Sequence, residues 1–271
     1  MRHIRIMALL IMLIVLFPLS AFAQKTNIQE TNLLGWNGNT WQKVAKGNIL
    51  HSKMVYMEDF LCYSNTTTGV AILAGASAPD NSNILTPVDW YWGTTLVGGG
   101  TVKIIAGVNG TAVIDTAHAA QNDAATLSWR EALFDISNNP SIEARVKINS
   151  LTNCTFEGGW YVDGNDECLF RFNPAVSATK FLTVYENNNG GEQVYTTATT
   201  ATTDTYVTLK IELFSTGAAK FWINGVLIKS YAASTIKDVA FKPRFYAKVA
   251  DAGHAATKTL TIDYVRITQD R

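Results

Sequence analysis

Polar and apolar residues alternate with a period of two along much of the chain, and this pattern constrains the fold more than any other feature. In SIEARVKIN (141–149), four apolar residues share one face of an extended strand, and Glu143, Arg145 and Lys147 share the other. The segment YVTLKIEL (206–213) repeats this alternation. Because successive side chains of a strand point to opposite faces, each segment predicts a strand with one buried and one solvated face.

Further strands are predicted at 181–186, 241–249 and 260–267. Helical periodicity is nearly absent from the sequence. Short strands at this spacing predict an all-β fold, an antiparallel two-sheet β-sandwich of the jelly-roll type. Turn signals separate the predicted strands: Asp163-Gly164-Asn165, Asn187-Asn188-Asn189-Gly190-Gly191, Ser215-Thr216-Gly217 and Asn224-Gly225.

The segment KFWINGVLIKSY (220–231) predicts a β-hairpin, because an Asn-Gly pair between apolar runs favours a two-residue type I′ turn. Trp222 then lies opposite Leu227 on the face away from the core, and we expect other side chains to cover at least part of its ring. The core face is predicted to hold two cross-strand pairs, Ile223 with Val226 and Phe221 with Ile228.

The first 23 residues have the layout of a cleavable secretory signal. Arg2 and Arg5 precede an apolar run that ends in small residues up to Ala23. The alternative is an uncleaved anchor, but the run falls short of the about 20 apolar residues of a spanning helix, and Pro18 interrupts it. We therefore predict a signal peptide at 1–23 and a secreted protein, extracellular or periplasmic, with no membrane segment after cleavage.

Residues 24–52 contain few regular strands and are predicted to form an N-terminal extension of a single domain at 53–271. Lys and Arg together number 22, as do Asp and Glu, so the formal net charge is zero. Such a balance provides no basic stripe for nucleic acid and no polybasic membrane patch, and neither partner is expected.

Three cysteines, Cys62, Cys154 and Cys168, leave one thiol unpaired if a disulfide forms. Cys154 and Cys168 are close enough in sequence to bridge neighbouring strands, and export would permit that bond. The alternative, three buried thiols, stays open. The histidines are scattered and there is no CxxC pair, so the sequence does not predict a zinc site.

The order of several segments carries a resemblance to a known group of proteins. The segments are EDF (58–60), GGGTVKIIAG (98–107), IEARVKI (142–148), WYVDGNDECLFRFN (160–173), KFWINGVLIKSY, PRFYAKV (243–249) and LTIDYVRI (260–267). Together they resemble the concanavalin A-like lectin/glucanase superfamily in its laminin-G-like form, as found in bacteriophage structural proteins and uncharacterised secreted proteins. The resemblance implies two packed antiparallel sheets, one of them curved, and a protein that binds glycans, cleaves them or serves as an adhesive or structural module.

Catalytic motifs of that superfamily are absent from the sequence. Its glucanases carry an E-x-D-x-x-E-type strand, and its lyases carry R-x-E-L-R-type and Q-I-H-type segments; none of these occurs here. The acidic cluster of Asp163, Asp166 and Glu167 lies at a predicted turn, where Asp, Asn and Gly are favoured for backbone reasons. The competing interpretation is a calcium loop, with Asp163 and Asp166 as candidate ligands. No other cofactor is expected.

Charged and aromatic side chains on predicted strand faces are the best candidates for ligand contacts. If their strands are neighbours, they would form one mixed-charge groove in which sugars stack on aromatic rings. The competing interpretation is a ladder of surface ion pairs, with most aromatic rings in the core. The candidate ligand-binding residues are Glu143, Arg145, Arg171, Tyr185, Arg244, Tyr246, Trp90 and Trp92.

The sequence therefore predicts a secreted, non-catalytic binding or structural module, with carbohydrate as its ligand and a surface or virion assembly as its setting. Two alternatives stay open. One is a glycan-active enzyme, a glycoside hydrolase or polysaccharide lyase, on the same fold. The other is a purely structural, phage-type virion protein, in which an apolar patch would mark the interface of a homo-oligomer.

Overall fold

The computed structural model describes residues 34–36, 41–43, 54–58, 70–74, 92–105, 110–116, 122–129, 131–163, 166–186, 191–233, 240–250 and 256–270. The chain divides into two compact units, one of residues 1–53 with residue 271 and one of residues 54–270. In the first unit, β1 (Leu34–Trp36) and β2 (Trp41–Lys43) form an antiparallel pair in which Trp36 faces Trp41. The second unit contains all the strands from β3 onward.

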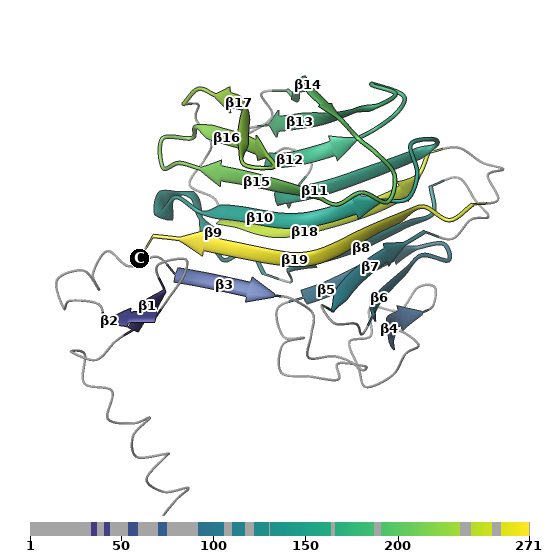
Figure 1. Cartoon of the computed structure of the whole chain (residues 1–271), viewed down its shortest axis with the longest axis horizontal. Coiled ribbons are helices and arrows are strands. Elements are labelled where there is room, and N and C mark those ends of the chain that lie inside the picture. Colours follow the sequence, from purple (N-terminus) through teal and green to yellow (C-terminus); the bar gives the residue numbers. More distant parts are fainter. Residues whose placement is uncertain are drawn as a thin grey trace, which may run out of the picture. The chain divides into compact units, whose positions relative to one another are not determined.

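Two antiparallel sheets make up the described part of this unit (Figure 1). The nine-stranded sheet has the order β17 (Val226–Tyr231), β16 (Ala219–Ile223), β15 (Val207–Leu213), β10 (Ser141–Ile148), β19 (Thr259–Gln269), β7 (Thr111–Asp115), β6 (Thr101–Ile105) and β4 (Val70–Ala74), with β3 (Met54–Glu58) also paired to β19. The eight-stranded sheet has the order β14 (Gln193–Thr200), β13 (Lys180–Glu186), β12 (Asp166–Phe172), β11 (Cys154–Asp163), β18 (Ala240–Val249), β8 (Ala124–Trp129) and β5 (Trp92–Val97), with β9 (Phe134–Asp135) also paired to β18.

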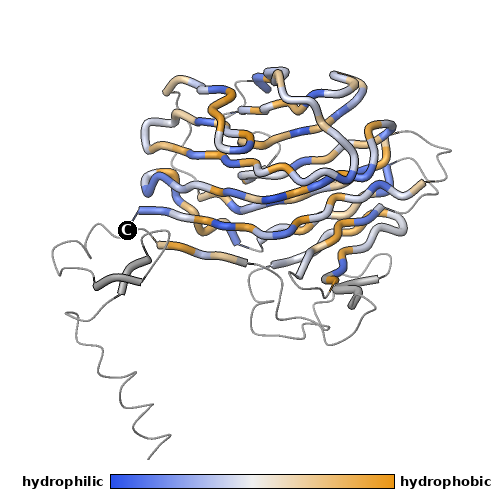
Figure 2. The backbone as a smooth tube through the Cα atoms, in the orientation of Figure 1, coloured by the Kyte–Doolittle hydropathy of each residue, from blue (hydrophilic) through white to orange (hydrophobic). Residues whose placement is uncertain are grey.

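Alternation along the strands decides which side chains enter the core. In β10, β15 and β18 every second residue is buried and the residues between are partly exposed. The same alternation is visible along the backbone in Figure 2. The predicted all-β, antiparallel two-sheet sandwich is therefore confirmed. None of the described residues belongs to a helix long and apolar enough to cross a membrane.

The core lies between the two sheets and is rich in aromatic rings. Phe170 of β12 meets Phe221 of β16 across the sandwich, with ring centroids 5.2 Å apart in an edge-on arrangement. Trp160 and Phe245 are also fully buried. Each such ring contributes about 1.5–3 kcal/mol relative to an exposed position, so aromatic packing is a major stabilising term for this fold.

The hairpin of β16 and β17 has the predicted turn but only part of the predicted register. Asn224 and Gly225 both have positive φ, 50° and 77°, as a type I′ turn requires. Ile223 pairs with Val226 as predicted, but the register shifts between Phe221 and Trp222, so that Phe221 pairs with Lys229. The predicted partner of Phe221, Ile228, is therefore displaced from that position.

The hairpin also differs from prediction in burial, because β17 is the edge strand of its sheet. Val226 was expected in the core, but it is 62% exposed at the hairpin tip. Trp222 is half-buried, as expected. Its indole Nε1 donates to Glu212 Oε2 at 3.0 Å, and Lys210 Nζ lies 5.9 Å from the ring centroid. Side chains of the adjacent strand β15 thus cover this tryptophan.

Candidate functional site

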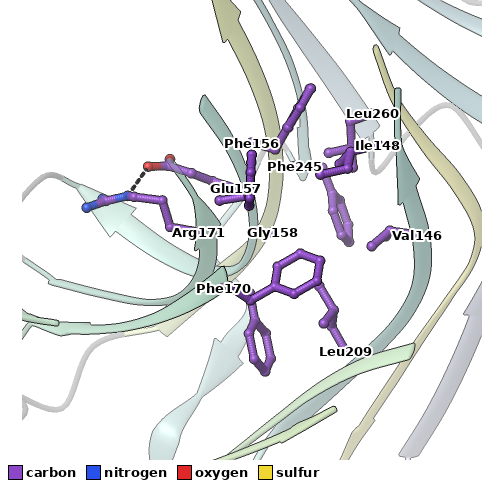
Figure 3. A pocket seen from close by; sticks show the side chains of 12 residues that line it. Val146, Ile148, Phe156, Glu157, Gly158, Phe170, Arg171, Leu209, Phe245 and Leu260 are labelled. Carbon is purple, nitrogen blue, oxygen red and sulfur yellow. Dashed lines mark hydrogen bonds and ion pairs between the residues drawn. The ribbon is translucent and has the colours of Figure 1, made fainter. Parts of the chain in front are cut away.

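A row of polar side chains crosses the outer face of the eight-stranded sheet, the face turned away from the core. Strand register creates this row: Glu157 on the central strand β11 pairs with Arg171 on β12 and with Tyr246 on β18. Figure 3 shows the two faces of the sheet, with Glu157 and Arg171 pointing to one side and Phe156, Phe170 and Phe245 lying on the other. Residues far apart in sequence therefore share one surface.

Two arginines and three glutamates on this face form a connected network, which we call the arginine–glutamate network. Arg171 Nε donates to Glu157 Oε1 at 2.7 Å, and Arg171 Nη2 donates to Glu167 Oε1 at 3.0 Å. Arg171 Nη1 also donates to Glu192. Arg244 Nη2 donates to the second oxygen of Glu157 and lies 3.7 Å from Glu167 Oε2. Glu157 and Glu167 are thus each held by both arginines.

Arg244 also stacks on aromatic rings. Its guanidinium carbon lies 3.7 Å from the centroid of Tyr161 and 5.6 Å from that of Tyr246. The residue opposite Arg244 on β11 is Gly159. Arg244 Nε is buried and has no hydrogen-bond partner among the residues that the structure describes. The guanidinium is therefore fixed by two carboxylates and a ring while one of its donors remains unused.

The two central carboxylates are nearly inaccessible, at 8% exposure for Glu157 and 5% for Glu167. Burial, reinforced by the charge of Glu157, raises the pKa of Glu167 to about 7, although Arg171 and Arg244 act to lower it. Burial and the same Glu157 charge also raise the pKa of Tyr246, which keeps its hydroxyl protonated. At neutral pH the network therefore contains a carboxyl group poised between its charged and neutral forms.

Apolar side chains continue this face beyond the network. Leu169 on β12 pairs with Val184 on β13, and both lie on the outer face yet are fully buried. They are separate from the aromatic core between the sheets, as is the neighbouring Leu182. Because these apolar side chains are fully buried, they stabilise the sheet and offer no accessible surface to a ligand.

Arg171, Arg244 and Tyr246 are the predicted ligand-binding residues that the fold brings together. Glu143 and Arg145 do not join them, because β10 belongs to the nine-stranded sheet. The hypothesis of a single groove that contains all five residues is therefore wrong. The five residues had been grouped by strand alternation alone, and alternation carries no information about which sheet a strand enters.

Glu143 and Arg145 have their own partners on the outer face of the nine-stranded sheet. Arg145 Nη1 donates to Asp263 Oδ2 at 2.7 Å. The hydroxyl of Tyr264 donates to Glu143 Oε1 at 3.0 Å. These contacts match the ladder of cross-strand polar pairs that was the competing interpretation for such residues.

Two of the aromatic candidates belong to the core. Trp92 packs edge-on against Trp129, with centroids 6.1 Å apart, and its Nε1 donates to the hydroxyl of Tyr56. Tyr185 stacks on Tyr231 at 4.8 Å and donates to the backbone oxygen of Gly217. Neither ring presents a face to an outside ligand, which corrects the prediction. Trp90 lies outside the described residues.

Sequence reasoning missed Glu157, Glu167 and Tyr161 as members of this site. Glu167 had been assigned to turn chemistry, whereas β12 begins at Asp166 and places Glu167 within a strand. The missed signal is the spacing within FEGGWY, where Glu157 and Tyr161 share a face across two glycines. Their partners on β12 and β18 are distant in sequence and could not be read from that spacing.

The proposed calcium ligands lie at the turn between β11 and β12. Asp166 is buried and pairs with Asp163 in the β11–β12 register. Within the described residues, no three or more His, Cys, Asp or Glu side chains are grouped so that they could hold a metal ion. A calcium ion at Asp163 and Asp166 stays a prediction.

Cys154 and Cys168 are both free and buried. They lie on β11 and β12, but Cys168 pairs with Trp160 rather than with Cys154. Of the two alternatives for this pair, the structure has the buried thiols. Cys62 lies outside the described residues.

Comparisons with known proteins support the fold. No protein-family model matches the chain, and no curated protein shows significant sequence similarity to it. Among solved structures, a glycoside hydrolase family 16 endo-glucanase from Bacteroides ovatus is similar, with a TM-score of 0.55 and 11% identity over 78% of this chain and 99% of that one. A Crh5 transglycosylase is similar over 79% of this chain and 83% of its own, with a TM-score of 0.52 and 15% identity.

The chain has the concanavalin A-like jelly-roll fold. Both of these structures are β-sandwiches of that kind, and the two antiparallel sheets described above fit it. A sialidase also matches, with a TM-score of 0.49 and 9% identity. The match covers 65% of this chain but only 17% of the sialidase chain. At these identities the likeness concerns the fold, and function must be argued from the site.

Proposed function

We propose that this protein is a secreted, non-catalytic carbohydrate-binding module and that the outer face of the eight-stranded sheet is its binding surface. The observation that carries the proposal is the stacking of Arg244 on Tyr161, 3.7 Å apart, beside Tyr246. Sugars bind through stacking on such rings and hydrogen bonds from fixed polar groups. The fold's occurrence in glycan-active enzymes such as the endo-glucanase and the transglycosylase supports this choice of ligand.

Preorganisation supports binding at this face. Glu157 fixes both arginines, so their side chains lose little additional freedom when a ligand binds. The hydroxyl of Tyr246 is a protonated donor on the same face. A sugar hydroxyl is an acceptor that such a donor recognises without any change in the network.

The experiment is a glycan array with the full chain, followed by titration of any ligand found. Tyr161→Ala is expected to weaken binding about tenfold or more, because stacking area is lost. The control is Tyr264→Ala on the opposite sheet, which is expected to leave affinity unchanged. If no glycan binds the wild-type chain, or if the two variants bind equally, the proposal is wrong.

A specific observation favours a second candidate, glycoside hydrolysis. Hydrolases use two carboxyl groups, one protonated and one ionised, and Glu167 with its pKa of about 7 lies beside Glu157 on the neighbouring strand. We favour binding because both carboxylates are held by the arginines and nearly inaccessible. Reducing-end assays on each bound glycan decide between them. Turnover that disappears in both Glu157→Gln and Glu167→Gln would establish the hydrolase.

Secretion is part of the proposal and is tested separately. The support is the leader at residues 1–23, with its basic start, apolar middle and small residues up to Ala23. Expression in a secreting host should yield an exported protein whose first residue is Gln24, as determined by mass spectrometry. Retention of the leader on a membrane-associated product would favour the anchor instead.

A further inference from the structure

A cavity lies at one end of the sandwich, where the connection from β14 to β15 passes the ends of β10 and β13 (Figure 1). Its empty space, counted together with open solvent at the mouth, is about 420 Å³. Its floor is apolar and formed by core residues, Val146, Ile148, Phe181 and Val207. Because the floor closes against the core, the cavity admits the end of a chain-like ligand rather than its middle.

The mouth of the cavity is lined by hydroxyl groups and one amide. Thr199, Thr200, Thr202 and Thr205 lie around it, together with Asn224 from the β16–β17 turn. Asn224 Oδ1 accepts from the backbone nitrogen of Thr208 at 2.9 Å, so its Nδ2 is directed to no group in the described part of the chain. Hydroxyls and amides above an apolar floor suit the hydroxyl groups and C–H faces of a sugar ring.

One side of the mouth is positively charged. Lys147 Nζ lies 5.1 Å from the ring centroid of Tyr206, and both residues line the cavity. The neighbouring Arg145 also lies over this ring, at 4.5 Å, but its charge is matched by Asp263. Lys147 has no carboxylate partner among the described residues, so its charge is available to an anionic ligand.

We propose that this cavity binds a terminal sugar residue that carries a carboxylate, with Lys147 as the partner of that carboxylate. Tyr206 and the apolar floor would contact the ring, and the threonine hydroxyls and Asn224 would contact its hydroxyl groups. A neutral sugar would leave Lys147 without an anion, and an apolar ligand would leave the hydroxyls unmatched. The proposal does not rest on the function proposed above, because neither Tyr161 nor any member of the arginine–glutamate network lines this cavity.

The experiment compares methyl glucuronide with methyl glucoside as probes of the full chain, by saturation-transfer NMR and titration. Wild type is expected to bind the glucuronide, and Lys147→Gln is expected to weaken that binding about tenfold, as for loss of a charge-assisted hydrogen bond. Lys220→Gln is the matched control, since Lys220 lies on the same sheet but does not line the cavity. It should bind as wild type does.

A second variant tests the location independently of charge. Thr202 is exposed in the β14–β15 connection, so Thr202→Trp should fill the mouth without disturbing the core, and we expect it to abolish glucuronide binding. Failure of wild type to bind the glucuronide, or unchanged binding in Lys147→Gln, overturns the proposal. Loss in Tyr161→Ala with retention in both cavity variants also overturns it while leaving the first binding surface intact.

Discussion

The guanidinium of Arg244 lies over the ring of Tyr161, with 3.7 Å between its central carbon and the ring centroid. Glu157, four residues before Tyr161 on the same face of β11, accepts a hydrogen bond from the same guanidinium. A planar cation can satisfy a ring and a carboxylate at once, which a lysine ammonium cannot do with the same geometry. This contact links the stability of the outer face to the ligand surface that it would present.

Arg244→Lys is therefore expected to destabilise the protein although the charge is retained. Loss of stacking and of the fork contact to a buried carboxylate should lower the free energy of unfolding by about 2 kcal/mol. Urea denaturation measures this difference. Arg266→Lys, at an exposed position on β19, should change the free energy by less than about 0.5 kcal/mol. Equal losses in the two variants would show that the stack contributes nothing.

Stability should fall as Glu167 ionises. Its pKa in the folded protein is about 7, above the ordinary value of 4.5, mainly because of burial. A raised carboxyl pKa favours the folded state at low pH, and that contribution is lost as pH rises from about 4.5 through 7. Because the carboxyl retains some contact with solvent, we expect a loss on the order of 2 kcal/mol, less than the full shift implies.

Glu167→Gln removes this titration, so it provides the measurement. From about pH 5 to about pH 8, the free energy of unfolding of wild type, measured by urea denaturation, should fall by on the order of 2 kcal/mol more than that of the variant. The variant should therefore gain relative stability at the higher pH. Parallel pH profiles for the two proteins would contradict the raised pKa.

The sequence was sufficient to predict the strands because their signals are local. Alternation in β10, β15 and β18 and the Asn224-Gly225 turn each depend on residues within one segment. The register shift between Phe221 and Trp222 could not be predicted in this way, because it is a property of two paired strands.

The candidate site was only partly predictable for the same reason. Arg171, Arg244 and Tyr246 were identified by type and by strand face, but their assembly depends on β12, β11 and β18 being neighbours. That order involves pairing between residues about ninety positions apart, such as Glu157 with Tyr246, for which alternation offers no signal. Burial of Glu157 on an outward face follows only from its two arginine partners.

Cys154 and Cys168 should be inert in the folded protein. Burial raises the pKa of Cys154 to about 11 and that of Cys168 well above its ordinary value, and the thiolate is the reactive form. We expect iodoacetamide at about pH 8 to leave both unmodified in the native protein and to modify both in concentrated guanidinium chloride. Peptide mass spectrometry separates them from Cys62. Rapid native labelling, or a disulfide-linked peptide, would contradict the buried free thiols.

Gly159 should tolerate no side chain, because β11 passes very close to its neighbours there. Its φ is +155°, and an added Cβ would lie 2.4 Å from the backbone oxygen of Cys168 and 2.7 Å from Ile211 Cδ1. Gly159→Ala is therefore expected to lower the free energy of unfolding, measured by urea denaturation, by about 3 kcal/mol, because relieving a clash with a backbone atom requires the strand to shift. Gly191→Ala is the matched control: its φ is also positive, +84°, but nothing lies within 4 Å of an added Cβ, so only about 1 kcal/mol of backbone strain is expected. A similar cost at both positions would mean that backbone strain, rather than the close approach of β11 to β12, explains why glycine lies opposite Arg244.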